Sequence, residues 1–233
     1  TGGCGVTEGD DRSFGGVMSG ASRFVAFASR AGNLVPGDSN GLDDVFVYDR
    51  SNGTVQRVSV ASDGTGGDIY SKYPSISSDG RFVAFHSRAT NLVTGDTNGR
   101  ADVFLHDRSS GTTTRLSVAD DGTEGDWHSE RTSISADGRF VAFHSGAGNL
   151  VAGDNNNKRD IFIYDRTAGT IGRIDTVNSG TELDGAAYYP DLSADGRFVT
   201  FMSYATNLVA DDTNGVSDVF VFDRTTGGME RIS

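Results

Sequence analysis

Hydrophobic residues in this chain occur in short runs with turn-forming residues between them, and no window of helical length shows a 3.6-residue period. One stretch shows the pattern well, with the segments "YPSIS", "RFVAFHS", "ADVFLHD" and "TTTRLSV" at residues 73–77, 81–87, 101–107 and 112–118. The turn-rich segments "SDG", "NLVTGDTNGR" and "RSSG" lie between them. Segments such as "RFVAF" are apolar on both alternating faces, as expected of strands covered on both sides. We therefore predict four short strands in this stretch.

The same pattern returns every 58 residues along the whole chain. An "RF" pair recurs at this spacing, beginning at Arg23, Arg81, Arg139 and Arg197. Four periods of 58 make 232, one residue less than the length of 233. We predict one domain, 1–233, made of repeats at about 1–58, 59–116, 117–174 and 175–233. A four-stranded unit repeated at this length predicts an all-β fold, a β-propeller with four blades of four antiparallel strands.

The segment "PSISSDGRFVAFHS" followed by "DVFLHDRSSGTTTRLSV" resembles the TolB-like, WD40-like propeller repeats known as PD40. The resemblance covers nearly the whole chain, and it implies a propeller that serves in binding or assembly. TolB itself has six blades, and its repeats are shorter. Two arrangements therefore stay open: closure of four blades into a ring, and a place in a larger ring. We expect a monomer, with a larger ring shared by two chains as the alternative.

Charge and composition limit the classes of molecule that this chain is expected to bind. The net charge is −12, with lysine only at positions 72 and 158, so we expect repulsion from nucleic acids and anionic membranes and attraction of cations. No apolar run approaches the ~20 residues of a membrane helix, so we expect no membrane insertion. The single Cys4 excludes an intramolecular disulfide. The first residues show no signal-peptide pattern, so we expect a processed N-terminus and a secreted or cell-envelope protein.

Two long loops in each repeat share one face of the predicted propeller. One connects the second and third strands, and the other links the fourth strand to the next blade. The remaining connections are tight turns on the opposite face. Because long polar loops on a rigid scaffold usually carry function, we predict the functional site on the long-loop face, at the mouth of the channel.

The first long loop contains a repeated Asp-x-Asn pattern followed by another Asp, at relative positions 1, 3 and 7. Side-chain and carbonyl oxygens of this kind suit calcium, although the pattern lacks further ligands of an EF-hand. The alternative is that Asp and Asn form Asx-turns that satisfy the backbone of the loop. We predict a structural calcium and keep the turn as the alternative. The candidate ligands are Asp38, Asn40, Asp44, Asp96, Asn98, Asp102, Asp154, Asn156, Asp160, Asp212, Asn214 and Asp218.

The second long loop is less regular and leads into the innermost strand. Its fullest form, "DGTEGDWHSERTS" at Asp121–Ser133, keeps a recurring Asp, while the positions after it differ between repeats. Such divergence on a constant frame suggests a site for one asymmetric ligand, with drift in tolerant loops as the alternative. Aromatic and charged side chains together suit a carbohydrate or a protein segment. The candidate binding residues are Arg12, Tyr70, Lys72, Tyr73, Trp127, His128, Glu130, Arg131, Tyr188 and Tyr189.

Catalytic chemistry has weaker support. Glu124 and Glu182 at equivalent positions, and His128 at the mouth, are the candidates for acid–base roles. His86 and His144 occupy a position where other repeats have Ala or Met, which indicates packing. No nucleophile elbow, phosphate loop or thiol–metal cluster occurs. We therefore predict a binding module rather than an enzyme. The alternatives are a hydrolase or lyase at the same mouth and a structural part of a larger propeller.

Overall fold

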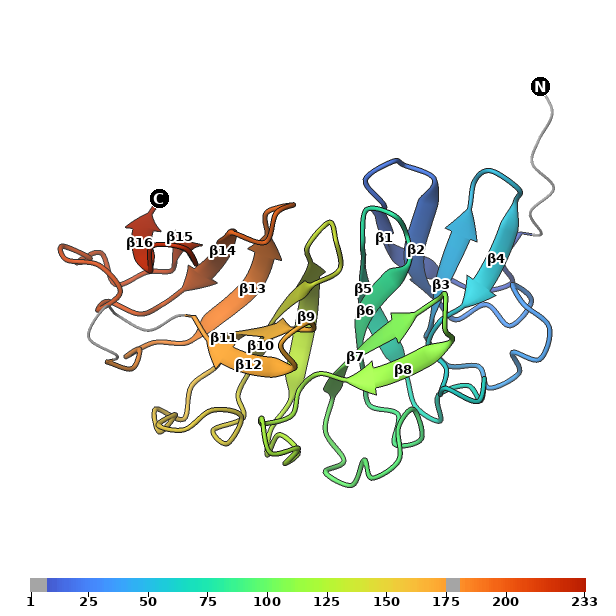
Figure 1. Ribbon diagram of the computed structural model, residues 1–233, viewed down its shortest axis with the longest axis horizontal. Helices are drawn as coiled ribbons and strands as arrows, with labels where there is room; N and C mark the ends of the chain where they lie inside the picture. The colour runs from blue at the N-terminus through green and yellow to red at the C-terminus, as the bar shows by residue number, and fades with distance from the viewer. Residues whose placement is uncertain (1–7, 175–180) are drawn as a thin grey trace.

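The computed structural model describes residues 8–174 and 181–233, so Cys4 lies outside the described residues. These residues form four four-stranded antiparallel sheets, the blades of a β-propeller (Figure 1). Blades 1 and 2 consist of β1 (Ser13–Met18), β2 (Phe24–Ser29), β3 (Asp44–Asp49), β4 (Thr54–Arg57), β5 (Ser71–Ile76), β6 (Phe82–Ser87), β7 (Asp102–Asp107) and β8 (Thr112–Arg115). Blades 3 and 4 consist of β9 (Ser129–Ile134), β10 (Phe140–Ser145), β11 (Asp160–Asp165), β12 (Thr170–Arg173), β13 (Ala187–Leu192), β14 (Phe198–Ser203), β15 (Asp218–Asp223) and β16 (Gly228–Arg231). In the part of the chain that is described, no helix is long and apolar enough to cross a membrane.

Each blade is built from contiguous sequence, because the strands of every sheet follow one another in sequence order. The four-bladed, four-stranded prediction is confirmed, and only strand ends differ. The fourth strand ends at Arg115 rather than Val118, because the hydroxyl of Ser117 takes the place of a backbone partner. This hydroxyl accepts the N–H of Val103 and donates to Asp102 at 2.6 Å. The first strand begins at Ser71 rather than Tyr73, since it continues through an irregularity in register.

The hydrophobic core lies between successive blades. The second strands β6 and β10 are buried along their whole length, as their apolar pattern on both faces predicts. In the cluster between blades 2 and 3, Ala84 and Val103 of one blade pack with Val141 and Phe143 of the next. Equivalent clusters join blades 1 and 2 and blades 3 and 4.

The blades follow one another along an open arc, from blade 1 (blue) at one end to blade 4 (red) at the other (Figure 1). The innermost strands β1, β5, β9 and β13 pack in succession, but among the described residues no comparable packing joins β13 to β1. Backbone bonds repeat at each junction, such as Ser71 N–H to Asp43 O at 2.6 Å and Ser129 N–H to Ala101 O at 2.8 Å. The described residues therefore do not form a closed four-bladed ring.

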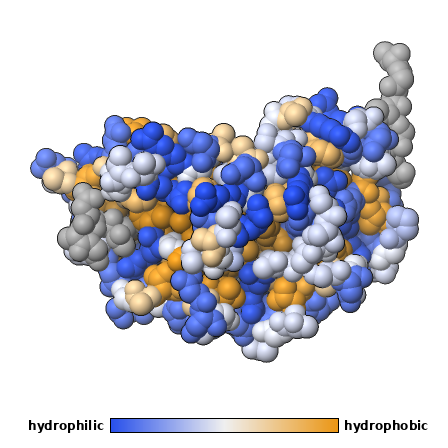
Figure 2. Space-filling view, in the orientation of Figure 1, coloured by the Kyte–Doolittle hydropathy of each residue, from blue (hydrophilic) through white to orange (hydrophobic). Residues whose placement is uncertain are grey.

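The visible surface is mostly hydrophilic, in keeping with the charge of the sequence (Figure 2). Hydrophobic side chains also reach the surface, including at the left-hand end, where blade 4 lies. Six of the large hydrophobic residues that are more than a third exposed belong to blade 4: Tyr189, Phe198, Tyr204, Val216, Val219 and Ile232.

Candidate functional site

An irregularity in every innermost strand shapes the centre of the arc. In each blade the register between the first and second strands shifts, and one residue in this stretch has a positive φ. These equivalent bulge residues are Gly15, Tyr73, Arg131 and Tyr189, with φ of 67°, 50°, 59° and 54°. Glycine adopts this conformation freely, whereas other residues carry a cost of about 1–3 kcal/mol. A bulge of this kind re-aims the side chain that it carries, and such strain is concentrated at functional sites.

The three bulge side chains stack on one another and line a central cavity of about 280 Å³. The guanidinium of Arg131 lies 3.5 Å from the centre of the Tyr73 ring and 5.4 Å from that of Tyr189. Among the described residues no carboxylate forms an ion pair with Arg131. The cavity thus combines aromatic faces with a cation whose charge is not matched locally.

Two histidines support the bulges from behind. His86 Nδ1 accepts the N–H of Arg131 at 3.4 Å, and His144 Nδ1 accepts the N–H of Tyr189 at 3.3 Å. Burial lowers the pKa of His86 to about 4 and also lowers the pKa of His144. A neutral ring can accept these bonds, so both histidines act as packing residues that hold the next blade, as their alignment with Ala and Met predicts.

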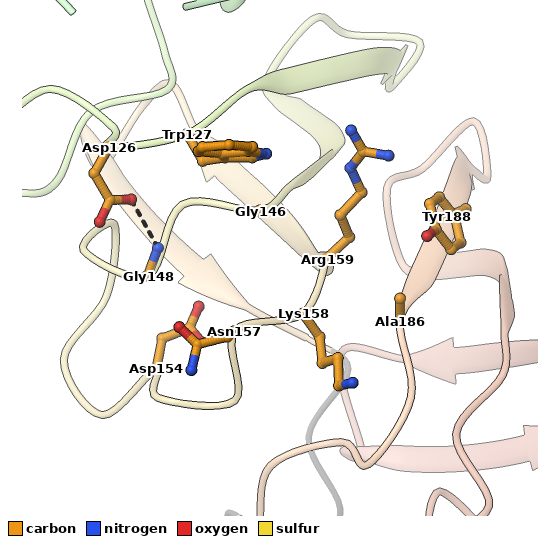
Figure 3. Close-up of a pocket in the computed structure, with 10 residues that line it drawn as sticks. All are labelled: Asp126, Trp127, Gly146, Gly148, Asp154, Asn157, Lys158, Arg159, Ala186 and Tyr188. Carbon is orange, nitrogen blue, oxygen red and sulfur yellow. Dashed lines mark hydrogen bonds between the residues drawn. The ribbon is translucent and has the colours of Figure 1, made fainter.

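An outer groove of about 520 Å³ lies between the loops of blades 3 and 4 (Figure 3). Its walls include Trp127, which is 46% exposed, and Tyr188. In the view of Figure 3 the guanidinium of Arg159 lies between these two rings. Arg159 is 5.7 Å from the Tyr188 ring and 3.6 Å from Glu130, while Arg100 lies over Trp127 at 4.4 Å. Both kinds of long loop contribute to this groove.

The remaining candidates are already engaged with the protein. Arg12 and Lys72 both bind Asp43 at 3.1 Å, and Lys72 also lies over the Tyr70 ring at 4.4 Å. His128 Nδ1 accepts the N–H of Ala101 at 2.8 Å. The ten predicted binding residues therefore form three groups: one around Asp43, one at the central cavity, and one at the outer groove.

Sequence reasoning missed Arg159, Arg100 and Asp43. All three belong to the regular first loop, whose most evident feature is its repeated Asp and Asn. The signal was present, because Asp43, Ala101, Arg159 and Ser217 are equivalent positions that differ in every repeat. Divergence in the regular loop was as informative as divergence in the irregular one.

The repeated acidic loops surround an arginine in each blade. In blade 2 the Arg115 guanidinium lies 3.3 Å from Asp96 and 4.0 Å from Asp102. Asn98 Oδ1 accepts the N–H of Arg100, an Asx-turn, and its NH₂ donates to Asp102. The arginines of the other blades, Arg57, Arg173 and Arg231, hold the equivalent first Asp.

Negative charge nevertheless exceeds positive charge in these clusters. Asp96, Asp102 and Glu124 share the single Arg115. Burial, followed by the charge of Asp102, raises the pKa of Asp96 to about 6. The same causes, from burial and Asp160, raise the pKa of Asp154 to about 7. The Asx-turn that was the alternative to calcium is therefore present in these loops, and calcium binding stays a prediction.

The candidate catalytic carboxylates are held by the same arginines. Glu124 accepts bonds from Thr97 and from Arg115, and Glu182 contacts Arg173 at 3.2 Å. Burial opposes ionisation of Glu124, but these hydrogen bonds outweigh it and lower its pKa to about 2. A carboxylate with such a low pKa is a poor general acid near neutral pH.

The whole arrangement matches solved propeller structures. TolB from Acinetobacter baumannii is 18% identical, with a TM-score of 0.59 over 96% of this chain and 44% of that one. A putative TolB from Agrobacterium tumefaciens is 20% identical, with a TM-score of 0.59 over 92% and 62% of the two chains. The β-propeller domain of the Trilobed protease from Pyrococcus furiosus is 10% identical, with a TM-score of 0.55 over 96% and 57%.

These likenesses show a TolB-like β-propeller fold. The chain spans less than two thirds of each of these structures. No protein-family model matches the sequence, and no curated protein sequence does either.

Proposed function

We propose that this chain is a binding module. Its long-loop face recognises a segment of another protein, and that segment carries acidic groups. The observation that carries the proposal is the stack of Tyr73, Arg131 and Tyr189 at three strained, equivalent positions. Glycine adopts this backbone conformation at no cost and occupies the position in blade 1, whereas the other three blades have tyrosine or arginine there. Secretion or an envelope location stays a prediction.

The chemistry of the mouth differs from that of the rest of the molecule. The chain carries a net charge of −12, yet Arg131, Arg159, Lys158 and Arg100 gather around the central cavity and the outer groove. Cations that stack on aromatic rings keep their hydrogen-bond donors available for a carboxylate. An acidic segment would thus meet attraction at the mouth and repulsion over the remaining surface.

A carbohydrate is the second candidate, and Trp127 is the observation that favours it. Its ring is about half exposed and forms one wall of the outer groove. A flat, exposed indole next to arginines is suited to the apolar face of a sugar ring.

Peptide and glycan arrays, each probed with the wild-type chain and three variants, test the proposal. Arg131→Gly should abolish binding to acidic peptides, because it removes the cation while keeping a residue suited to the backbone there. Arg50→Ala changes an exposed arginine on the opposite face and should leave binding unchanged. Binding to glycans that is lost in Trp127→Ala, without binding to peptides, would favour the carbohydrate. Binding that survives both mouth variants would refute a site at the mouth.

We also propose that calcium binds the acidic loops, supported by three carboxylates that share one guanidinium in blades 2 and 3. Added calcium would then raise the unfolding temperature, and a chelator would lower it, because ligand binding to the folded state stabilises it by mass action. The same measurement with magnesium gives the control. An unchanged midpoint across calcium concentrations would leave the arginine-centred turn as the whole role of these loops.

A further inference from the structure

Blade 4 exposes a face that the other blades bury. We define the forward face of a blade as the residues that pack against the following blade. In blade 1 these include Phe24, Ala26, Val45, Val47 and Val58, which belong to the core cluster shared with blade 2. The 58-residue period places their equivalents in blade 4 at Phe198, Thr200, Val219, Val221 and Ile232.

The exposure of these residues changes abruptly at blade 4. Val219 is 41% exposed, whereas its equivalents Val45, Val103 and Ile161 are fully buried. Ile232 is 58% exposed, whereas its equivalents Val58, Leu116 and Ile174 are at most 5% exposed. The apolar character of an inter-blade interface is therefore retained on a surface that no described residue covers.

Phe198 shows the same incompleteness. The rings of Phe24, Phe82 and Phe140 each lie between two arginines, one from their own blade and one from the next. The arginines from the next blade are Arg108, Arg166 and Arg224, at 4.7, 4.1 and 3.8 Å. Among the described residues, Phe198 has one such arginine, Arg197 of its own blade, at 4.6 Å.

Backbone groups on this face lack the bonds that recur at the inner junctions. The carbonyls of Asp43, Ala101 and Arg159 each accept an N–H from the next blade. Among the described residues no such bond reaches the equivalent carbonyl of Ser217. The N–H of Ala136 donates to the carbonyl of Ala194, whereas within residues 8–174 and 181–233 no equivalent backbone carbonyl accepts the N–H of Ala194.

A glycine in the first tight turn of the incoming blade completes each inner junction. Gly80, Gly138 and Gly196 pack so closely on Phe24, Phe82 and Phe140 that a Cβ atom there would overlap the ring. The equivalent residue of blade 1 is Ser22. Blade 1 of a second copy would therefore bring a Cβ against Phe198, where the inner junctions have none.

We infer that the forward face of blade 4 is a docking surface for a further blade of the same 58-residue repeat. This blade carries glycine in its first tight turn and arginine after its third strand. The surface continues an interface that already occurs three times in the molecule, and its apolar residues, ring and backbone groups match the residues used there. Thr200, in place of alanine, is the one polar departure.

The test appends such a blade to the full chain. Ser233 is equivalent to Ser59, so a copy of residues 60–116 placed after Ser233 continues the repeat in register. Hydrogen exchange of β14 and β15 should slow at least tenfold, and the unfolding midpoint should rise. A second extension uses a copy of residues 118–174. It provides an independent test in case the first appended copy does not fold.

Two matched controls identify the contacts. The first control is the substitution Gly80→Ser within the appended copy. It should remove the protection of β14 and β15 from hydrogen exchange. Phe198→Ser in the extended chain should do the same, while Arg50→Ala, at an exposed position of blade 1, should not.

The inference is overturned if neither extension slows exchange in β14 and β15. It is also overturned if the unextended chain forms dimers or longer assemblies that Phe198→Ser abolishes, because a second copy would then be the partner. Sedimentation of the unextended chain at high concentration should show a monomer.

Discussion

At the scale of single residues, the strained bulge in each innermost strand is the clearest indication of which side chains serve a ligand and which serve the fold. Four equivalent positions share a left-handed backbone, yet only blade 1 uses the residue that adopts it at no cost. Tyr73, Arg131 and Tyr189 persist there, and each contacts another of the three or a supporting histidine. The cost of the conformation is understandable if these side chains serve a ligand rather than the fold.

Replacing Arg131 measures that strain directly. Both Arg131→Gly and Arg131→Ala remove the guanidinium, so the difference between them reports on the backbone. Glycine in a strand is ordinarily less stable than alanine by roughly 0.5–1 kcal/mol. At φ of 59° we expect the reverse, with Arg131→Gly more stable than Arg131→Ala by about 1 kcal/mol in denaturant unfolding. An alanine variant as stable as the glycine variant would contradict strain at this position.

His86 should make the stability depend on pH. The pKa of His86 is about 4 in the folded state and about 6.5 in the unfolded state, so between these values only the unfolded chain takes up the proton. The contribution of His86 to the free energy of unfolding is therefore fully present above pH 6.5 and is lost as the pH falls towards 4. Glu130, Arg131, His144 and Lys72 are the charged groups that act on it. The loss over this window should be on the order of 2 kcal/mol.

The variant His86→Met, which places the residue of blade 4 in blade 2, should flatten this part of the pH profile. Urea unfolding between pH 4 and pH 7 provides the measurement. The remaining slope should come in part from His144, whose pKa is lowered by the same cause. A profile as steep in the variant as in the wild type would assign the dependence to other groups.

Residue roles were the part of the site that the sequence predicted least well. Comparing repeats included Tyr73, Arg131 and Tyr189, which occupy equivalent positions, among the ten candidates, and the structure places these three around one cavity. The same comparison could not show that His128 is occupied by the N–H of Ala101, since that bond joins residues 27 positions apart. Repeat alignment identifies equivalent positions, whereas contacts between different positions depend on the fold.

At the scale of elements, each hairpin of second and third strands is closed by an arginine–aspartate clamp. Arg81, directly before β6, donates two bonds to Asp107 at the end of β7, and Arg139 does the same to Asp165. The bonds from arginine lower the pKa of Asp107 and that of Asp165 to about 2. Strand positions were predictable because the apolar runs are short and sharply bounded, but this partner of Asp107 was not.

The clamps should contribute to acid unfolding. Because the folded pKa values lie below the unfolded value of about 3.9, their stabilisation is present above pH 4 and is lost as pH falls to about 2. The arginines are nearly half exposed, so screening by water keeps the contribution of each clamp to stability small. Arg139→Gln should reduce the pH dependence between 4 and 2, and the control Arg50→Gln should not. Equal acid midpoints for all three proteins would show that the clamps contribute nothing measurable.

At the scale of the whole molecule, the repeat length predicted the number of blades but not the closure of the ring. The period counts units, whereas closure depends on the angle between them and on whether the last face meets the first. The open ends appear in the sequence only as small departures, such as Ser22 in place of a turn glycine and Thr200 in place of alanine. These departures became interpretable once the structure showed which faces meet.

An open arc of repeats should open from its ends. In such a chain each blade is stabilised by its neighbours, so blades 2 and 3 have two stabilising interfaces and blades 1 and 4 have one. Native-state hydrogen exchange should therefore be slowest in β6 and β10, whose residues are all buried, and fastest in β14, β15 and β16. Uniform exchange across the four blades would instead indicate ends that meet in solution. The same experiment on the chain extended by one repeat should move the fast-exchanging end outward to the added blade and leave β14 and β15 protected like β10 and β11.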